Sequence, residues 1–353
     1  MLRIAVAGAG LIGRRHIDLV RQRMDCQLTA IVDPAPPAQA IASRLAVPSY
    51  PSIPALLARD RPDGIIVATP SQLHLEHALT TIGAGLPTLL EKPIATTVRD
   101  GVRIARAAAG RGVPLLIGHH RRHSPILGAA KRVVDSGILG RPAAVTGAAM
   151  FRKPDAYFDE APWRGEPGGG PLLVNMIHEI DSLRHLCGEI VSVQALASSS
   201  LRGFPVEDTV AMSMAFESGA LGTFMLSDAA ASVSSWELTS GENPAYPNVA
   251  DVDCYVIAGD AGSLGVPTLR LRWYTGTPSW WDAMRSELID VERRDPLEEQ
   301  LAQFCAVIRG DAAPLVSGWD GVQNLLVIEA IVEAARTGTV VATPSVHAAI
   351  EGR

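Results

Sequence analysis

Leu2-Arg3-Ile4-Ala5-Val6-Ala7-Gly8-Ala9-Gly10-Leu11-Ile12-Gly13 opens the chain, and a helical pattern follows from residue 14 to about residue 23. The glycines form a G-x-G-x-x-G turn between strand and helix. The first makes the turn, the second lets a pyrophosphate approach the backbone, and the third lets helix and strand pack closely. A phosphate would then lie at a helix N-terminus. The turn predicts a dinucleotide site at Gly8, Gly10, Leu11, Ile12 and Gly13; a glycine-rich turn without a ligand is the alternative.

A second apolar run, residues 28–32, ends at Asp33, 20 residues after Gly13. A dinucleotide site places there the acid that binds the ribose hydroxyls. Asp33 would repel the 2′-phosphate of NADP, and Pro34 after it supplies no cation. We therefore expect NAD rather than NADP; the alternative is that Asp33 is an ordinary turn residue.

The first third of the chain alternates strand and helix patterns. Further strands are expected at residues 64–69, 88–90 and 114–118, with helical stretches between them. This alternation predicts a doubly wound parallel sheet. Ligands bind beyond the carboxyl ends of such strands, where the glycine turn, Asp33, Thr69-Pro70 and Lys92 all fall.

The pattern changes after residue 122. A helix at 125–136 is followed by β-like runs at 143–151, 190–199, 209–216, 220–227, 254–258 and 264–274, and helices near 296–309 and 320–337 close the chain. Several runs alternate with period two, which predicts a mostly antiparallel sheet with one open face. We expect an α/β protein with a first domain at 1–122 and a second at 123–349. Residues 350–353 spell a protease-cleavage linker and are interpreted as an engineered remnant.

The composition excludes several classes of protein. The 353 residues are 47% apolar and 19% charged, which excludes a largely disordered chain, and the net charge of −6 is spread without a basic block, so no nucleic-acid partner is expected. No apolar run is long enough to span a membrane, no leader precedes the first strand, and the four cysteines are far apart in sequence, which favours a cytoplasmic protein with free thiols. The nine histidines do not combine with carboxylates at ligand spacing, so no metal is expected.

A second polar cluster follows Gly168-Gly169-Gly170. The helical run 172–186 carries Asn175, His178 and Asp181 at intervals of three residues, which allows them to share one helix face. This face could line a cleft, or it could be a solvated face whose histidine is satisfied by Asp181. The irregular stretches 153–170 and 240–249 are long enough to be functional or interfacial loops.

Taken in order, these motifs resemble the Gfo/Idh/MocA oxidoreductases, the relatives of glucose-fructose oxidoreductase, inositol dehydrogenase and dihydrodiol dehydrogenase. The resemblance rests on the glycine turn, Ala68-Thr69-Pro70 with His74, Glu91-Lys92-Pro93, Arg122 followed by Pro125, and Gly168-Gly169-Gly170 with His178 and Asp181. It implies a Rossmann domain and a substrate-binding domain whose open sheet packs against a neighbouring subunit, in a homodimer or homotetramer. It also implies hydride transfer between NAD(P) and a hydroxyl-bearing carbon of a sugar, cyclitol or related ring.

Residue by residue, the resemblance makes Lys92 and His178 the catalytic pair and implies a cis bond before Pro93. The residues that it places near the cofactor are Thr69, Pro70, His74, Glu91 and Lys92. The inositol-dehydrogenase pattern has an aspartate four residues before the histidine. This chain has Val174 there and Asn175 one position later, so inositol specificity does not transfer directly.

The proton of the substrate hydroxyl needs a base while hydride leaves carbon. A lysine ordinarily titrates near about 10.4 and a histidine near about 6.5. We therefore expect His178 to be the general base and Lys92 to orient and polarise the oxygen, unless a cationic nicotinamide lowers the pKa of the lysine enough to reverse the roles.

Further candidates for the substrate cleft are Arg122, His119, His120, Trp163 and Arg164. A salt bridge between domains is the alternative role for Arg122, and simple packing is the alternative for Trp163. We expect an NAD-dependent dehydrogenase of a secondary hydroxyl or ketone in a sugar, cyclitol or related cyclic polyol. The alternatives are a dihydrodiol dehydrogenase of aromatic degradation and a non-catalytic NAD-binding sensor.

Overall fold

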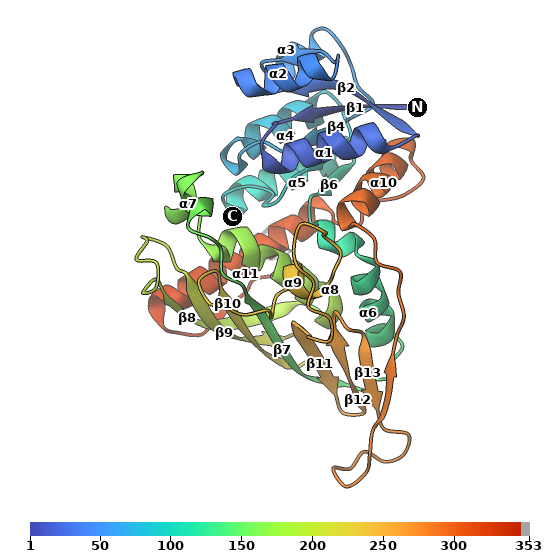
Figure 1. Ribbon diagram of the computed structural model, residues 1–353, viewed down its shortest axis with the longest axis vertical. Coiled ribbons are helices and arrows are strands. Elements are labelled where there is room, and N and C mark those ends of the chain that lie inside the picture. The colour runs from blue at the N-terminus through green and yellow to red at the C-terminus, as the bar shows by residue number, and fades with distance from the viewer. Residues whose placement is uncertain (347–353) are drawn as a thin grey trace. The chain divides into compact units, whose positions relative to one another are not determined.

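The computed structural model describes residues 1–346, and its chain divides into two units (Figure 1). The first unit comprises Met1–His120 and Leu297–Leu325, and the second comprises Arg121–Pro296 and the chain from Leu326 onward. The predicted boundary at residue 122 lies close to this division. The placement of residues 297–325 in the second domain differs from the structure, which groups them with the first unit. The interpreted remnant at 350–353 lies outside the described residues.

The first unit contains a six-stranded sheet in the order β3-β2-β1-β4-β5-β6, and every pair of neighbouring strands is parallel. The strand order reverses between β1 and β4, so the predicted doubly wound sheet is confirmed. The strands are β1 (Leu2–Ala7), β2 (Cys26–Val32), β3 (Ser49–Tyr50), β4 (Gly64–Val67), β5 (Thr88–Leu90) and β6 (Leu115–Ile117). The helices are α1 (Leu11–Gln22), α2 (Pro36–Arg44), α3 (Ile53–Leu57), η1 (Ser71–Leu73), α4 (His74–Gly83), α5 (Val98–Arg111), α10 (Pro296–Arg309) and the start of α11 (Gly318–Thr337).

Helix α10 joins the first unit because it packs on the start of β4. A Cβ on Gly64 would lie 2.5 Å from Ile308 Cδ1 and 3.1 Å from Phe304 Cζ, so the glycine makes room for the helix. Phe304 and Cys305 are fully buried. These contacts join segments more than 200 residues apart in the sequence, which is why local patterns do not reveal them.

The second unit contains a nine-stranded sheet in the order β14-β13-β12-β11-β7-β10-β9-β8-β15. Only β7 and β10 pair in parallel, so the predicted mostly antiparallel sheet is confirmed. The strands are β7 (Pro142–Met150), β8 (Ile190–Ser198), β9 (Thr209–Phe216), β10 (Leu221–Ser227), β11 (Tyr255–Gly259), β12 (Gly262–Val266), β13 (Arg270–Trp273), β14 (Arg285–Leu288) and β15 (Val341–Ala342). The helices are η2 (His120–His123), α6 (Pro125–Asp135), α7 (Ala156–Asp159), η3 (Pro162–Gly165), η4 (Leu172–Met176), α8 (Ile177–Cys187), α9 (Trp236–Thr239) and the end of α11.

The run 264–274, predicted as one strand, is two strands joined by a turn. The turn contains a cis Val266–Pro267 bond and Leu269 at φ +55°. Proline has no N–H to donate to a neighbouring strand, and a left-handed residue leaves the extended conformation. The ladder therefore breaks between β12 and β13.

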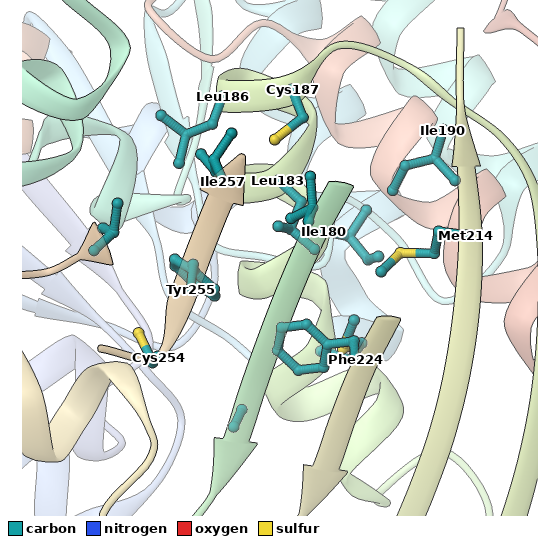
Figure 2. Packing of buried hydrophobic residues seen from close by; sticks show 14 of the residues in the cluster. Ile180, Leu183, Leu186, Cys187, Ile190, Met214, Phe224, Cys254, Tyr255 and Ile257 are labelled. Atoms are coloured by element: carbon teal, nitrogen blue, oxygen red, sulfur yellow. The ribbon is translucent and has the colours of Figure 1, made fainter. Parts of the chain in front are cut away.

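One face of the second sheet is covered by helices. Ile180, Leu183 and Leu186 of α8 lie among Phe224, Tyr255 and Ile257 of the strands, as Figure 2 shows. Along β10, Phe224 and Leu226 are buried whereas Leu221 and Met225 are exposed. The alternation leaves the opposite face open, as the period-two pattern predicts. Among the described residues, no helix is both long and apolar enough to span a membrane.

The loop at residues 240–249 is fixed to the second unit by Glu242. This side chain is 6% exposed and accepts a hydrogen bond from Ser124 Oγ at 2.5 Å. Burial raises the pKa of Glu242 to about 7, although Ser124, Trp236, Arg121 and Arg293 favour the charged form. The protonated carboxyl is therefore favoured in the folded state.

We predict that Glu242→Gln makes stability less dependent on pH. Because the folded pKa exceeds the unfolded value, the wild type loses stability as pH rises from about 4.5 through about 7. The variant keeps the hydrogen bond and should gain roughly 3 kcal/mol relative to the wild type over this range. Urea unfolding at pH 5 and pH 8 measures the difference, and Glu217→Gln, at an exposed position, is the control. Equal pH dependence of the wild type and Glu242→Gln would contradict the prediction.

Candidate active site

The glycine turn has the geometry of a dinucleotide fingerprint. Gly8 has φ +90°, and a Cβ on it would lie 2.5 Å from Ala68 O. A Cβ on Gly13 would lie 2.0 Å from Gly8 O, whereas a Cβ on Gly10 would meet nothing within 4 Å. Helix α1 starts after Gly10 without a side-chain cap. The turn thus combines tight packing at its first and third glycines with open backbone at the second, which fits a pyrophosphate.

Asp33 follows β2 and is hydrogen-bonded to the glycine turn. Its Oδ2 accepts from Ala9 N at 2.8 Å, and its Oδ1 accepts from Ala35 N at 2.8 Å. A carboxylate has about four lone-pair sites, so both oxygens can still accept from ribose hydroxyls. The two backbone contacts fix the position of the carboxylate beside the turn.

The ends of β4 and β5 are joined through His74. Its ring nitrogens lie 2.7 Å from Pro93 O and 2.9 Å from Thr69 O, and the side chain is only 1% exposed. Burial lowers the pKa of His74, so the neutral ring donates to one of the two carbonyls. Thr69 Oγ1 also lies 2.9 Å from His77 Nδ1. His74 therefore fixes the backbone on both sides of the predicted cofactor edge.

Lys92 follows β5 and precedes the implied cis bond, which the structure contains between Lys92 and Pro93. The neighbouring Glu91 is buried, and its Oε1 lies 2.8 Å from Nε2 of His16 on α1. Burial opposes the charge of Glu91, but His16, Lys92 and His120 outweigh it and hold the pKa of Glu91 below its ordinary value. A buried anionic Glu91 therefore lies next to Lys92 in the sequence.

His119, a candidate substrate residue, follows β6. It is 1% exposed, and its Nε2 lies 3.1 Å from Asn324 Nδ2 of α11. His120 is the next residue and begins η2. Within the first unit, the structure therefore places His119 against α11.

In the second unit, Arg121 and Arg122 form ion pairs with two acids that follow His178 on α8. Arg121 donates to Glu179 at 2.6 Å and to Glu237 at 2.5 Å, and Arg122 donates to Asp181 at 3.2 Å. Burial opposes the charge of Arg121, but Glu179, Glu237 and Tyr255 raise its pKa well above the ordinary value. Removing one partner of such a buried ion pair strongly destabilises the fold, because the other charge is left buried and uncompensated. His178, 7% exposed, is thus carried on a helix held by ion pairs at both neighbouring acids.

The Gly168-Gly169-Gly170 turn leads into the helix through close backbone packing. A Cβ on Gly169 would lie 2.2 Å from Trp163 O, and one on Gly170 would lie 2.4 Å from Glu207 Oε1. Glu207 Oε1 also accepts from Leu172 N at 2.9 Å. The predicted α-helix from 172 begins as a π-helical turn, η4, and becomes α-helical only at Ile177. The shared face predicted for Asn175, His178 and Asp181 assumes α-helical geometry, and Asn175 lies in the π-helical turn before that geometry begins.

Sequence reasoning missed Lys153, which contacts Asn175. Lys153 Nζ donates to Asn175 Oδ1 at 2.7 Å and lies 3.4 Å from Asp228 Oδ2. The side chain is 7% exposed, and its burial lowers the pKa of Lys153 against the effect of Asp228. A signal was present: the chain has three lysines, and two of them, Lys92 and Lys153, directly precede a proline after a β-run.

Trp163 and Arg164 lie in η3. The Trp163 side chain is exposed, and Arg164 lies over the Tyr157 ring with its Cζ 3.8 Å from the ring centroid. Arg164 also donates to Tyr157 O at 2.5 Å. The structure therefore brings Arg164, Tyr157 and Lys153 together, since Lys153 Nζ lies 4.9 Å from the same ring centroid.

The described residues contain one cluster of potential metal ligands, Asp25, Cys26 and Cys305, with ligand atoms within 4.8 Å of one another. Asp25 accepts from Arg23 at 2.9 Å and from Arg309 at 2.7 Å. Two guanidinium groups already neutralise this carboxylate, which disfavours a cation there. All four cysteines are free and buried. The absence of a metal remains a prediction.

Two family models match the chain. Residues 2–119 match an oxidoreductase family with an NAD-binding Rossmann fold, and residues 128–264 match the GFO/IDH/MocA C-terminal domain. Inositol 2-dehydrogenase 3 of Saccharopolyspora erythraea is 29% identical over 351 residues, which cover 96% of this chain and 95% of that protein. The 1,5-anhydro-D-fructose reductase of Ensifer adhaerens is 28% identical over 294 residues, which cover 82% of each.

A solved structure extends this likeness to three dimensions. The WlbA dehydrogenase from Bordetella pertussis, crystallised with NADH and UDP-GlcNAcA, superposes with a TM-score of 0.78 at 27% identity and covers 97% of this chain and 99% of that one. Together with the glycine turn, Glu91-Lys92-Pro93 and the helix that carries His178, these matches establish the family. The chain belongs to the Gfo/Idh/MocA oxidoreductases, with an NAD-binding Rossmann domain.

Proposed function

We propose that the protein is an NAD-dependent dehydrogenase that transfers hydride between the nicotinamide and a secondary hydroxyl or ketone of a sugar, cyclitol or related cyclic polyol. The observation that carries the proposal is that the chain has both an open glycine turn with Asp33 beside it and a His178 helix held by buried ion pairs. The relatives named above are an inositol dehydrogenase and an anhydrofructose reductase, which supports a polyol substrate.

The residues of the first unit fit NAD. The N-terminus of α1 and the open face of Gly10 would hold the pyrophosphate, and Asp33 would hold the adenosine ribose. Thr69, Pro70, His74 and Glu91 would line the nicotinamide side. Bound NAD supplies the carbon that accepts the hydride.

Lys92 and His178 would share the proton chemistry of the substrate hydroxyl. His178 would take the proton as general base, because an imidazole is mostly neutral near pH 7. Lys92 would donate to the same oxygen, and its positive charge would stabilise the negative charge that develops there. Arg121 and Arg122, by holding Glu179 and Asp181, would keep the His178 helix in place.

We predict that Lys92→Met and His178→Asn each lower kcat about 10²- to 10⁴-fold while NADH binding persists. His178→Asn should also abolish the acidic limb of the pH profile of kcat/KM, because it removes the group that must be deprotonated. Stopped-flow absorbance measures turnover and its pH dependence, and NADH fluorescence titration measures NADH binding. Lys131→Met is the control, since Lys131 pairs with Asp135 on the surface. Full activity of His178→Asn would exclude the assigned base.

We predict that kcat/KM is about 100-fold higher with NAD than with NADP. Asp33 would lie against the 2′-phosphate of NADP, and Pro34, Pro36 and Pro37 after it offer no cation. Asp33→Ser should narrow the ratio by about tenfold or more, because it removes the repulsion. Asp18→Ser, at an exposed position of α1, should leave the ratio unchanged. A wild type that uses both cofactors equally would refute the cofactor preference.

We further propose that a second copy of the chain covers the open face of the second sheet. In one row across four strands, Leu196 pairs with Ala211, Ala211 with Met225, and Met225 with Ala148. Leu196 is 72% exposed and Met225 is 38% exposed. A row of apolar and small side chains on an open sheet is typical of an interface.

We predict that light scattering gives a multiple of the 37.3 kDa chain mass, consistent with a dimer or tetramer. Leu196→Lys with Met225→Lys should produce monomers at unchanged secondary structure, because both side chains are already exposed and only the shared interface would bury the charges. A wild-type monomer at micromolar concentration would exclude this interface.

A further inference from the structure

Lys153 is a buried cation that the chemistry proposed above does not use. Its Nζ donates to Asn175 Oδ1 at 2.7 Å and lies 3.4 Å from Asp228 Oδ2 and 4.9 Å from the Tyr157 ring centroid. An ammonium group has three N–H donors and no acceptor. Among the described residues, Asn175 and Asp228 occupy two of these donors, which leaves one.

The contact with Lys153 fixes what Asn175 can offer a ligand. Because the lysine ammonium can only donate, the Asn175 atom that faces it must be the amide oxygen. The contact with Lys153 therefore fixes which way round the amide lies. The half-buried Asn175 therefore has its Nδ2 hydrogens left for a ligand. It can donate to a substrate oxygen but presents no free acceptor for a hydroxyl proton.

Arg164 adds donors beside the same aromatic ring. Its guanidinium lies 3.8 Å from the Tyr157 ring centroid, and one of its nitrogens donates to Tyr157 O. The Arg164 Nε is buried and has no hydrogen-bond partner among the described residues. A buried donor without an acceptor is costly, and it indicates a position where an acceptor is missing.

The cations of this cluster differ in their carboxylate partners. Lys153 and Arg202 both contact Asp228, at 3.4 Å and 3.0 Å, and Arg202 also pairs with the exposed Asp155. In the described part of the chain, Arg164 pairs with no carboxylate. Lys153, Asn175 and Arg164 therefore form a group of hydrogen-bond donors, and the guanidinium of Arg164 has no carboxylate partner among the described residues.

We propose that Lys153, Asn175 and Arg164 bind a carboxylate of the substrate, so that the substrate is a hydroxy acid of the sugar or cyclic polyol class. This inference rests on the proposed function and narrows its substrate. Charge-assisted hydrogen bonds from lysine and arginine to a carboxylate are stronger than those between neutral groups. Asn175 lies three residues before His178, which places the carboxylate subsite on the segment that carries the proposed base.

The test compares matched pairs of compounds that differ only in the carboxylate, such as glucose with glucuronate and galactose with galacturonate. NADH-loaded protein is titrated with each compound by calorimetry, and NAD reduction is measured with each. We expect the acid of at least one pair to bind 100-fold or more tightly than its neutral partner. If no acid binds more tightly than its partner, across a panel that also contains aldonic and cyclic hydroxy acids, the proposal is overturned.

Variants separate the subsite from a purely structural role. Asn175→Asp keeps the size and the acceptor for Lys153 but replaces the donor with a negative charge, so binding of the acid should fall 100-fold or more, and the preference for the acid over its neutral partner should be lost. Arg164→Leu should raise KM for the acid at least tenfold with little change in kcat, and Lys131→Met should change neither value. Unchanged affinity for the acid in both Asn175→Asp and Arg164→Leu would overturn the assignment.

The outcomes also distinguish this inference from the proposed function. Turnover of neutral polyols alone would leave the dehydrogenase intact and remove the carboxylate subsite. Selective binding of acids without NAD reduction by any compound would support the subsite and count against the dehydrogenase.

Discussion

Helix α1 can lie against the first sheet only because Gly13 has no side chain: a Cβ there would lie 2.0 Å from Gly8 O. This close approach sets the position of everything that follows on the helix. It leaves the first turn of α1 beside the open Gly10, and one turn later it brings His16 to 2.8 Å from Glu91. The spacing of a single strand and helix thus sets the geometry of the predicted phosphate site and the position of the buried carboxylate that precedes Lys92.

Much of the fold follows from sequence because its signals are local. The parallel sheet could be predicted from runs of β-branched residues, glycine turns and polar residues at the strand ends. The open antiparallel sheet could be predicted from the runs that alternate with period two. Three features escaped because they depend on distant or three-dimensional contacts. Helix α10 packs on Gly64 across most of the chain, Pro267 divides one β-like run into two strands, and η4 widens the helix at Asn175.

The candidate site shows the same limit. Asp33, Thr69 and Lys92 could be named because each follows a strand, and the carboxyl ends of parallel strands meet at one edge. Lys153 could not be connected with Asn175, because the two residues are 22 positions apart in the sequence and no period links their positions. Arg121 was also missed, because its partners Glu179 and Glu237 lie far from it in the sequence and at no regular interval. Buried ion pairs of this kind are specified by packing, and only the folded chain shows them.

The two edge strands of the second sheet are either charged or very short, unlike the strands that form its open face. Strand β14, at one edge, exposes all four of its residues, including Arg285 and Glu287, and β15 at the other edge has only two residues. Charged or very short edge strands are poor templates for the addition of another strand. These edges therefore disfavour growth of the sheet into larger sheets and fibrils by edge-to-edge pairing. The proposed pairing through the open face would, in contrast, end once the two faces cover each other.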